Sequence, residues 1–290
     1  MTAGASAWQR FRAHRMAAVC GGVVLAIAAA CYAGPLIAGA AGLDATTIDA
    51  RLGATPPGAA HWFGTDALGR DLLVRVLIGG RIAIAVALVA AAIAVVIGVS
   101  YGAIAAYAGG AIDNAMMRLV DVLYGFPTLV LVIVVMAVTG ARSLVGLIGL
   151  IGAISWLTLA RITRGQVLAL RRREFVEAAR ALGAPPVRVL VRHVLPSAAG
   201  PVIVYATLAL PQVMLTEAVL SFLGLGVQAP LASWGTLVTE GSAQIVVYPW
   251  LLVFPAIAMG AAILALNFVG DGIRDALDPS AGYRSQPGSR

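Results

Sequence analysis

The chain has 290 residues, 60% of them hydrophobic and 11% charged, whereas soluble domains carry about 25% charged residues, so a soluble globular protein is excluded. At about 20 apolar residues per membrane-spanning helix, the chain holds about five to seven spans and no large additional domain, which predicts an all-α polytopic membrane protein. Its net charge is +7 and all 20 basic residues are arginine, so the absence of lysine excludes a Walker A loop and Schiff-base chemistry on this chain.

The first apolar stretch, residues 16–43, follows three arginines and contains both cysteines, Cys20 and Cys31. Along a helix these cysteines are about 16 Å apart, so they cannot form a disulfide with each other. The stretch is longer than the apolar region of a signal peptide, which favours a retained membrane anchor over a cleaved leader. The three histidines are scattered, so no metal site is predicted.

Five more charge-free stretches can each hold one spanning helix. They are residues 82–112, 122–141, 143–160, 194–216 and 241–270. A further charge-free stretch, residues 218–239, is interrupted by glycines, polar residues and a proline. We expect irregular structure there, at a membrane surface.

Two local patterns stand out in the first half of the chain. In the connection between the first two spans, Asp66 and Arg70 are spaced i, i+4 and could pair on a short helix; a solvated turn capped by Thr65 or Asp66 is the alternative. In the second span, small residues recur every fourth position and predict a seam where another helix approaches closely. These small residues are Gly98, Gly102, Ala106 and Gly110.

The distribution of arginine sets the predicted orientation. With the N-terminus inside, fifteen arginines lie on the inner side and five on the outer side, as the positive-inside bias requires. The same bias, rather than a nucleic-acid partner, explains the basic charge. The expected organisation is therefore N-in and C-in. It comprises a cytoplasmic tail 1–15, a first helix 16–43, an outer connection 44–81, a core 82–270 with five helices and a cytoplasmic loop 161–193, and a cytoplasmic tail 271–290.

The long cytoplasmic loop contains a predicted short helix that ends near Gly183. Its apolar positions follow i, i+3, i+4, i+7 spacing and form one face, made of Phe175, Ala178, Ala179 and Leu182. Arg173 and Glu177 form an expected i, i+4 pair outside this face, and prolines follow the glycine and stop the helix. Such a helix fits either a groove in a partner protein or the lipid surface.

The spacing Glu177-Ala178-Ala179, three residues, Gly183, nine residues, then His193-Val194-Leu195-Pro196 resembles the EAA loop of bacterial ABC importer permeases. In that family the loop is a coupling helix that docks into a cleft of the cytoplasmic ATPase. The resemblance implies that the coupling residues here are Phe175, Glu177, Ala178, Ala179, Arg180, Leu182 and Gly183.

Further segments resemble the C-type permease subunit of the oligopeptide, dipeptide and nickel transporters. They are residues 64–71, 121–127, 217–226, 234–235 and 270–279. One departure is Ala229-Pro230, where that family has two prolines. The resemblance implies a type I ABC importer permease bundle, of the MetI-like kind, with six transmembrane helices in the bacterial inner membrane.

By the same resemblance the chain forms half of a pathway for dipeptides or oligopeptides; nickel chelates, glutathione and opine-like compounds are the alternatives. Its implied partners are a homologous second permease, two cytoplasmic ATP-binding subunits that hold ATP and Mg, a substrate-binding protein on the outer side, and membrane lipid. The chain itself is expected to be no enzyme and to carry no cofactor or metal.

Glu217, just past the fifth span, could meet a peptide amine or an arginine of the partner, or be an interfacial carboxylate in water. Gly98 and Gly102 could face the pathway or the partner permease.

Two other classes compete with this interpretation. An ion-coupled secondary transporter places ionisable residues within its spans, and the six expected spans contain none, because Glu217, Glu240 and Asp271 fall at predicted ends. A membrane enzyme needs a cluster of catalytic or metal-binding groups, which the sequence does not show.

Overall fold

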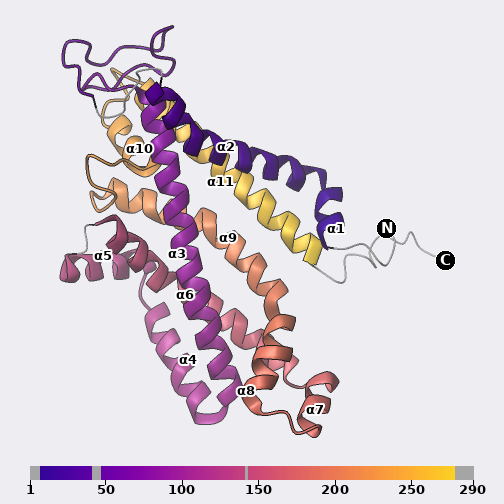
Figure 1. The fold of residues 1–290 in the computed structure, drawn as a ribbon. Coiled ribbons are helices and arrows are strands. Elements are labelled where there is room, and N and C mark those ends of the chain that lie inside the picture. The colour runs from indigo at the N-terminus through magenta and orange to yellow at the C-terminus, as the bar shows by residue number, and fades with distance from the viewer. Residues whose placement is uncertain (1–6, 41–46, 141–142, 278–290) are drawn as a thin grey trace, which may run out of the picture.

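The structure is a computed structural model that describes residues 7–40, 47–140 and 143–277. The regular elements in these ranges are helices, which confirms the all-α prediction (Figure 1). They are α1 Ala7–Ala13, α2 Arg15–Ala40, α3 Leu72–Ala108, α4 Gly110–Tyr124, α5 Thr128–Thr139, α6 Leu144–Leu170, α7 Glu174–Ala181, α8 Pro186–Val189, α9 Leu195–Phe222, α10 Trp234–Ser242 and α11 Trp250–Leu277, with a π-helical turn Leu190–Val194 leading into α9.

Five segments of the described chain are long and apolar enough to cross a membrane. They are α2, α3, α6, the continuous Pro186–Phe222 segment and α11. A sixth crossing exists only if α4 and α5 count as one span, and these two helices are bent by 89°. The expectation of one spanning helix over 122–141 is therefore wrong, because this stretch holds the end of α4, a break and α5. Pro127 explains the break, because its ring removes a donor and disfavours helical backbone at Phe126.

Four expected boundaries shift because charged residues lie inside helices. α3 begins at Leu72 rather than at residue 82, so it includes Arg75 and Arg81. α6 continues to Leu170, through the first part of the expected cytoplasmic loop. α9 extends to Phe222 and α11 to Leu277. The charge-free criterion fails at these helices because several of their charged side chains have partners within the protein, as described below.

The segment expected to be irregular contains a helix. α9 ends inside it, and α10 begins at Trp234 behind a capping box, in which Ser233 and Thr236 satisfy each other's main-chain N–H groups. The peptide between Ala229 and Pro230 is cis. The short extent of α10 explains why a search for long apolar runs does not find it.

The predicted small-residue seam is confirmed, and α6 of the same chain is the helix that occupies it. A Cβ atom on Gly98 would lie 2.7 Å from the Cβ atom of Leu159, and one on Gly102 would lie 2.2 Å from the carbonyl oxygen of Ala160. Ala106 is fully buried, whereas a Cβ atom on Gly110 would meet nothing within 4 Å. The seam therefore ends before Gly110. α3 and α6 form the main packing axis of the bundle.

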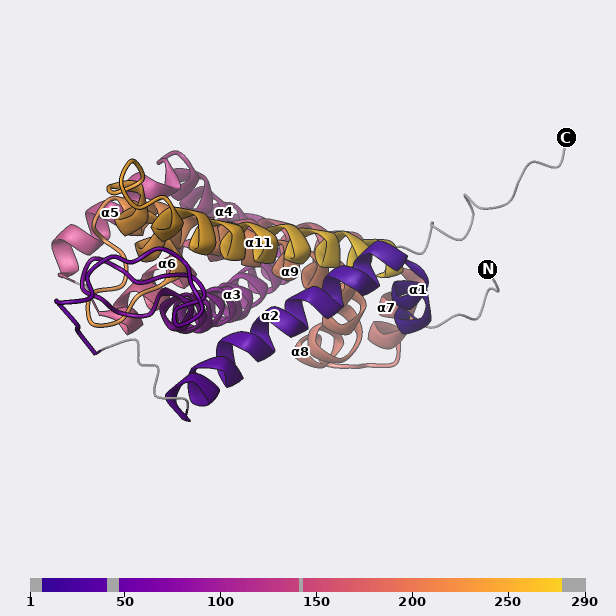
Figure 2. The same ribbon diagram turned by 90° about the horizontal axis from the view of Figure 1, so that it is seen from above.

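α2 runs along the outside of the bundle, against α11 and α3 (Figures 1 and 2). Its two cysteines are free, and Cys31 is buried where Gly80 of α3 and Trp234 of α10 come close together. Close packing recurs at the other end of α2, where Ala17 contacts Gly272 of α11. The first apolar stretch is thus a packed helix of the bundle.

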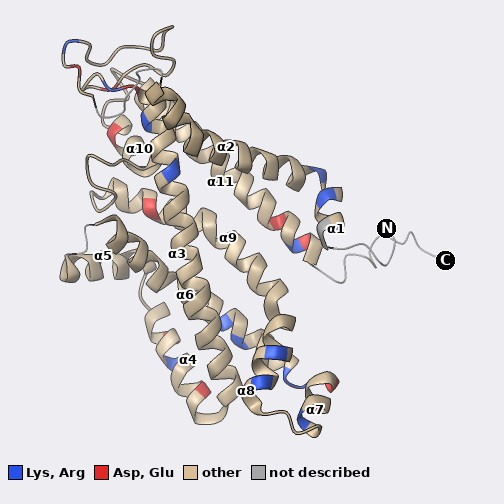
Figure 3. Cartoon of the chain, viewed as in Figure 1, with Lys and Arg blue, Asp and Glu red and all other residues tan. Residues whose placement is uncertain are grey.

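The two ends of the bundle differ in their contents. α7 and α8 lie at one end, and residues 47–71 and α10 lie at the other (Figure 1). Arginines gather near α7, α8 and the end of α6, as Figure 3 shows. Four stretches lie outside the described residues, 1–6, 41–46, 141–142 and 278–290. They contain several of the predicted boundaries, and also Asp278 and Pro279 of the last resembling segment.

Candidate coupling helix and outer polar network

The short helix predicted in the cytoplasmic loop forms as α7. It begins after Arg173, whose backbone is extended, and carries Glu174 and Glu177 in its first turn, where carboxylates stabilise the helix dipole. It ends before Gly183, which has φ +79° and whose N–H donates to the carbonyl oxygen of Arg180 at 2.9 Å. A left-handed backbone is the conformation that glycine adopts without strain.

The face of α7 that was predicted to be apolar is largely exposed. Phe175 is 45% exposed and Leu182 is 89% exposed, and Ala178 is also exposed, while Ala179 is half-buried. The expected ion pair between Arg173 and Glu177 is not among the ion pairs of the described chain. The apolar face is therefore free to contact something outside this chain.

A residue that the sequence reasoning missed, Val176, attaches α7 to the bundle. Its side chain is fully buried and joins a hydrophobic cluster that draws on five elements. The other buried members are Ala103 and Ala106 of α3, Val167 of α6, Val189 of α8 and Val194 before α9. Val176 is the sole β-branched residue of α7, and that is the signal that could have found it.

Ion pairs brace the helices next to this cluster. Arg164 of α6 binds Asp113 of α4 with two hydrogen bonds, Nε to Oδ1 at 2.6 Å and Nη2 to Oδ2 at 2.8 Å. Arg171 donates from Nη1 to the carbonyl oxygen of Ala106 at 2.8 Å, near the C-terminal end of α3, where a cation is favourable. These contacts hold α3, α4 and α6 together close to the base of α7.

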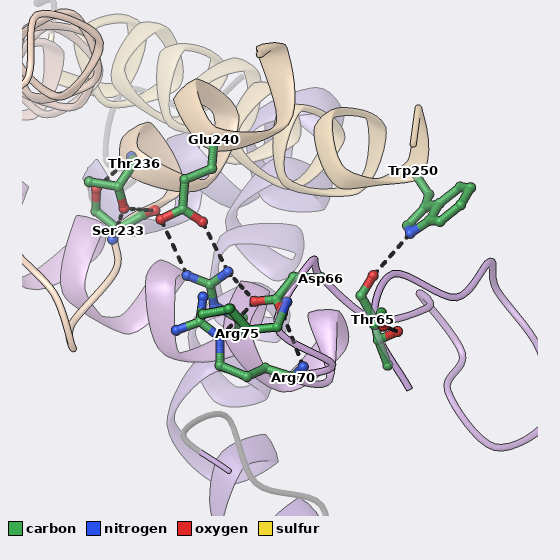
Figure 4. A network of polar contacts seen from close by, with 10 residues as sticks. Thr65, Asp66, Arg70, Arg75, Ser233, Thr236, Glu240 and Trp250 are labelled. Atoms are coloured by element: carbon green, nitrogen blue, oxygen red, sulfur yellow. Dashed lines mark hydrogen bonds and ion pairs between the residues drawn. The ribbon is translucent and has the colours of Figure 1, made fainter. Parts of the chain in front are cut away.

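At the opposite end of the bundle, Asp66 lies at the centre of a polar network (Figure 4). Its Oδ2 atom accepts from Arg70 Nε at 2.7 Å and from Arg75 Nη1 at 2.6 Å. Its Oδ1 atom accepts from the main-chain N–H groups of Leu68 and Arg70. The predicted Asp66–Arg70 pair is confirmed, but it closes a turn and not a helix. The alternative, a solvated turn, is confirmed as a turn in which Asp66 accepts from the main chain, but it is wrong about solvation, because Asp66 is 5% exposed and Thr65 is fully buried.

This network ties residues 64–71 to three helices. Arg75 of α3 also donates to Glu240 of α10, at 3.0 Å from Nη1 and 3.4 Å from Nη2. Trp250 at the start of α11 donates from Nε1 to the carbonyl oxygen of Thr65 at 3.2 Å. Asp71 caps α3 by accepting from the N–H of Val74 at 3.0 Å. The network fixes the outer connection onto the ends of α3, α10 and α11.

Residues 98–283 match the family of binding-protein-dependent transport system inner membrane components. The chain belongs to this family. Residues 2–56 match a second family, the N-terminal transmembrane domain of oligopeptide transport permease C. The protein is thus a multi-pass permease of the inner membrane.

Curated relatives of this permease cover most of its length. The oligopeptide transport system permease protein OppC of Haemophilus influenzae is 51% identical over 219 residues, 76% of this chain and 70% of the relative. The dipeptide transport system permease protein DppC of Bacillus subtilis is 40% identical over 274 residues, 94% of this chain and 84% of the relative. The glutathione transport system permease protein GsiD of Pectobacterium atrosepticum is 38% identical over 223 residues, 77% and 74% of the two chains.

A solved structure has the same fold as the permease. A chain of the methionine ABC transporter MetNI, in inward-facing conformations, superposes with a TM-score of 0.57 at 19% identity. The match covers 71% of this chain and 96% of that chain. The expectation of a MetI-like helical bundle is therefore confirmed.

In the permease, Glu217 does not lie at a helix end in water. It is inside α9 and 1% exposed, and its Oε1 atom accepts from Ser221 Oγ at 2.8 Å and from Ser233 Oγ at 2.6 Å. The interfacial-carboxylate alternative is wrong, and so is the expectation that the spans hold no ionisable residue. Gly98 and Gly102 are packed against α6, so they are covered within the chain. Sequence reasoning missed both serines. The i, i+4 spacing of Glu217 and Ser221 could have found the first, whereas Ser233 lies sixteen positions from Glu217.

Proposed function

We propose that the chain is the permease subunit of a binding-protein-dependent ABC importer, that it forms half of the translocation pathway for dipeptides or oligopeptides, and that α7 couples it to a separate ATPase. The observation that carries the proposal is that α7 has one side buried in the bundle and one side exposed. One side is anchored in the bundle by Val176, and the other side exposes Phe175, Ala178 and Leu182. Family membership supplies the context.

The exposed side of α7 suits a groove in a protein. Ala178 permits a close approach of another backbone, and the larger Phe175 and Leu182 flank it on the same face. Glu177 and Arg180 are exposed beside this face and offer charges for pairing. Gly183 ends the helix in a left-handed turn. We assign these residues, with the half-buried Ala179, to the contact with the ATPase.

The energy for transport comes from the partner subunits in this proposal. Two cytoplasmic ATP-binding subunits hold ATP and Mg and hydrolyse the nucleotide, because this chain has no lysine for a Walker A loop. Closure of the ATPases pushes α7, and the Val176 cluster passes the push to α3, α6 and α9. A homologous second permease supplies the other half of the pathway. A substrate-binding protein delivers the substrate, and the bundle rocks as a rigid body.

The orientation proposed is N-in and C-in. The end that carries α7 holds most of the arginines of the described chain (Figure 3), in accord with the positive-inside bias. The end that carries the Asp66 network would then face the substrate-binding protein. The substrate class rests on the relatives named for oligopeptide and dipeptide transport. The relative named for glutathione transport favours a second candidate, the tripeptide glutathione.

The test is co-purification of the affinity-tagged chain from detergent-solubilised native membranes. The wild type is expected to bring down a second permease and the ATPase subunits. Glu177→Arg reverses an exposed charge of α7, and Gly183→Pro is incompatible with φ +79°. Both variants are expected to retain the second permease and lose the ATPases.

A matched control reverses an exposed charge away from α7. Arg118→Glu on α4 is expected to retain every partner. If the tagged wild-type chain comes down alone or only with copies of itself, the coupling proposal fails and an ion-coupled transporter becomes the better hypothesis. Retention of the ATPases by both α7 variants would remove α7 from the contact.

A further inference from the structure

A polar cavity of about 600 Å³ lies between helices in a part of the bundle that contains none of the predicted site residues. It is formed by the end of α4, the start of α5, and the middle parts of α6, α9 and α11. α9 packs between α6 and α11 (Figure 1). The volume is within the range of about 300–1,000 Å³ found for sites that bind small molecules.

The cavity lining offers hydroxyl and carboxamide groups. α9 contributes Tyr205, Gln212 and Thr216, and the other helices contribute Tyr124, Thr158 and Asn267. None of the fourteen described residues that line the cavity is Asp, Glu, Lys, Arg or His. The surface is therefore polar but neutral, although ion pairs such as Arg164–Asp113 lie on the same helices.

Several of these groups have unused hydrogen-bonding capacity. Within the described chain, neither the Gln212 carboxamide nor the Tyr205 hydroxyl has a hydrogen-bond partner, and both residues are exposed to the cavity. Asn267 donates from Nδ2 to the carbonyl oxygen of Ile263 at 2.9 Å, which leaves its Oδ1 atom able to accept. Thr216 donates to the carbonyl oxygen of Gln212 at 2.8 Å, and its lone pairs also remain available.

The polar groups of α9 follow one side of the helix. Tyr205, Gln212 and Thr216 are spaced i, i+7, i+11, so they share a face. At 1.5 Å per residue they extend over about 16 Å. An extended chain rises about 3.3 Å per residue, so this stripe matches about five residues of peptide.

We propose that the cavity binds the main chain of a peptide in transit, with the Gln212 carboxamide paired to one peptide group. The inference rests on the proposed function as a peptide importer. A carboxamide and a peptide group each carry a donor and an acceptor, so they can pair through two hydrogen bonds. Peptides of every sequence share this main chain. The lining residues are neutral, and Arg161, which lies over the Tyr124 ring, is paired with Asp121. The cavity therefore accepts peptides as a class with little selection for their charge.

The test uses the complete transporter, with its own binding protein, in cells supplied with Ala-Ala-Ala, Ala-Lys-Ala or Ala-Glu-Ala. Gln212→Leu removes the hydrogen-bonding groups at similar size and is expected to slow uptake of all three peptides about tenfold. Gln212→Glu keeps the shape and adds a negative charge. It is expected to raise the uptake ratio of the lysine peptide to the glutamate peptide about threefold or more relative to wild type, by charge complementarity.

The matched control is Gln166→Leu, which changes a glutamine of α6 that does not line the cavity and is expected to transport like wild type. Co-purified partners measure how much assembled complex each variant contains, and uptake is expressed per complex. Because all variants share one binding protein, a changed ratio reports on the permease. If both Gln212 variants match Gln166→Leu for every peptide, the cavity does not bind the main chain. If the wild-type complex takes up none of the peptides, the proposed function itself fails.

Discussion

Arg75 Nη1 donates to Glu240 Oε2 at 3.0 Å, which joins the first turn of α3 to α10 across 165 positions of sequence. The same nitrogen lies 2.6 Å from Asp66 Oδ2, so one guanidinium group serves two carboxylates. The two carboxylates differ in environment, because Asp66 is buried and the Glu240 side chain is 51% exposed. We therefore expect the Arg75–Asp66 pair to contribute more to stability than the Arg75–Glu240 pair.

Removing the arginine should be far more damaging than removing the exposed carboxylate charge. Arg75→Leu leaves Asp66 buried with one partner fewer, and a broken buried pair costs about 3–5 kcal/mol. Glu240→Gln removes a half-exposed charge, at a cost of about 0–1 kcal/mol. Thermal unfolding of the purified complex, measured for both variants and the wild type, checks the contrast. Equal shifts in Tm would show that the network does not depend on burial.

The contact between α3 and α6 should not tolerate a single methyl group at Gly102. Gly102→Ala places a Cβ atom 2.2 Å from the carbonyl oxygen of Ala160, and backbone cannot yield as a flexible side chain does, so we expect a loss of about 1–3 kcal/mol. The matched control is Gly165→Ala on α6, whose Cβ atom meets nothing within 4 Å. That variant should be neutral or stabilise the helix by up to about 1 kcal/mol. The yield of folded chain in membranes and its Tm measure both effects. Similar yields and Tm values for the two variants would contradict the seam geometry.

Val176→Ala should weaken the link between hydrolysis and transport. The change removes buried methyl groups from the cluster that anchors α7, at about 0.8 kcal/mol per buried carbon group. A looser α7 still binds the ATPase but transmits less of its motion, so the ATP hydrolysed per peptide imported should rise. Val187→Ala, at a side chain that is 72% exposed, should leave this ratio unchanged. A proportional fall in hydrolysis and transport after Val176→Ala would contradict the mechanical role of this residue.

At Glu217, the accepting oxygen should matter more than the charge. Glu217→Gln retains an oxygen that accepts from Ser221 and Ser233, so its yield and Tm should remain close to wild type. Glu217→Leu leaves two buried hydroxyl groups unsatisfied, at about 1–3 kcal/mol each. Adding Ser221→Ala to Glu217→Leu should restore part of the loss, because the Ser221 hydroxyl is then no longer stranded; Ser233 is kept because its Oγ caps α10. A glutamine variant as unstable as the leucine variant would show that the negative charge is required.

Local patterns predicted the features that depend on local physics. The position of α7, its end at Gly183 and the seam at Gly98 and Gly102 all follow from helical spacing and side-chain size. The rule that spans are free of charge failed at Arg75 and at Glu217. Each residue has one partner that is distant in sequence, Glu240 for Arg75 and Ser233 for Glu217, and single-sequence spacing carries no signal for such pairings, although the i, i+4 spacing of Glu217 and Ser221 does.

The orientation of α7 shows the same limit. Its amphipathic pattern was found, but the buried position is Val176, and the face built from Phe175 and Leu182 is the exposed one. When a short helix has apolar residues on two sides, its own sequence does not determine which side becomes buried. Val176 is the buried residue because the small side chains of Ala103 and Ala106 on α3 leave room for a valine. The cavity was missed for a similar reason, because its polar residues are spread over five helices.

The break between α4 and α5 has a consequence for water inside the bilayer. α5 has twelve residues, or about 18 Å of helix, against about 30 Å of hydrocarbon. Its first turn follows Pro127, so the N–H groups of Thr128, Leu129 and Val130 have no helical partner. In lipid such donors are costly, but Tyr124 and Thr128 on either side of the break border the cavity. Because water is the partner that such donors need, we expect the cavity to be hydrated where it meets this break between α4 and α5.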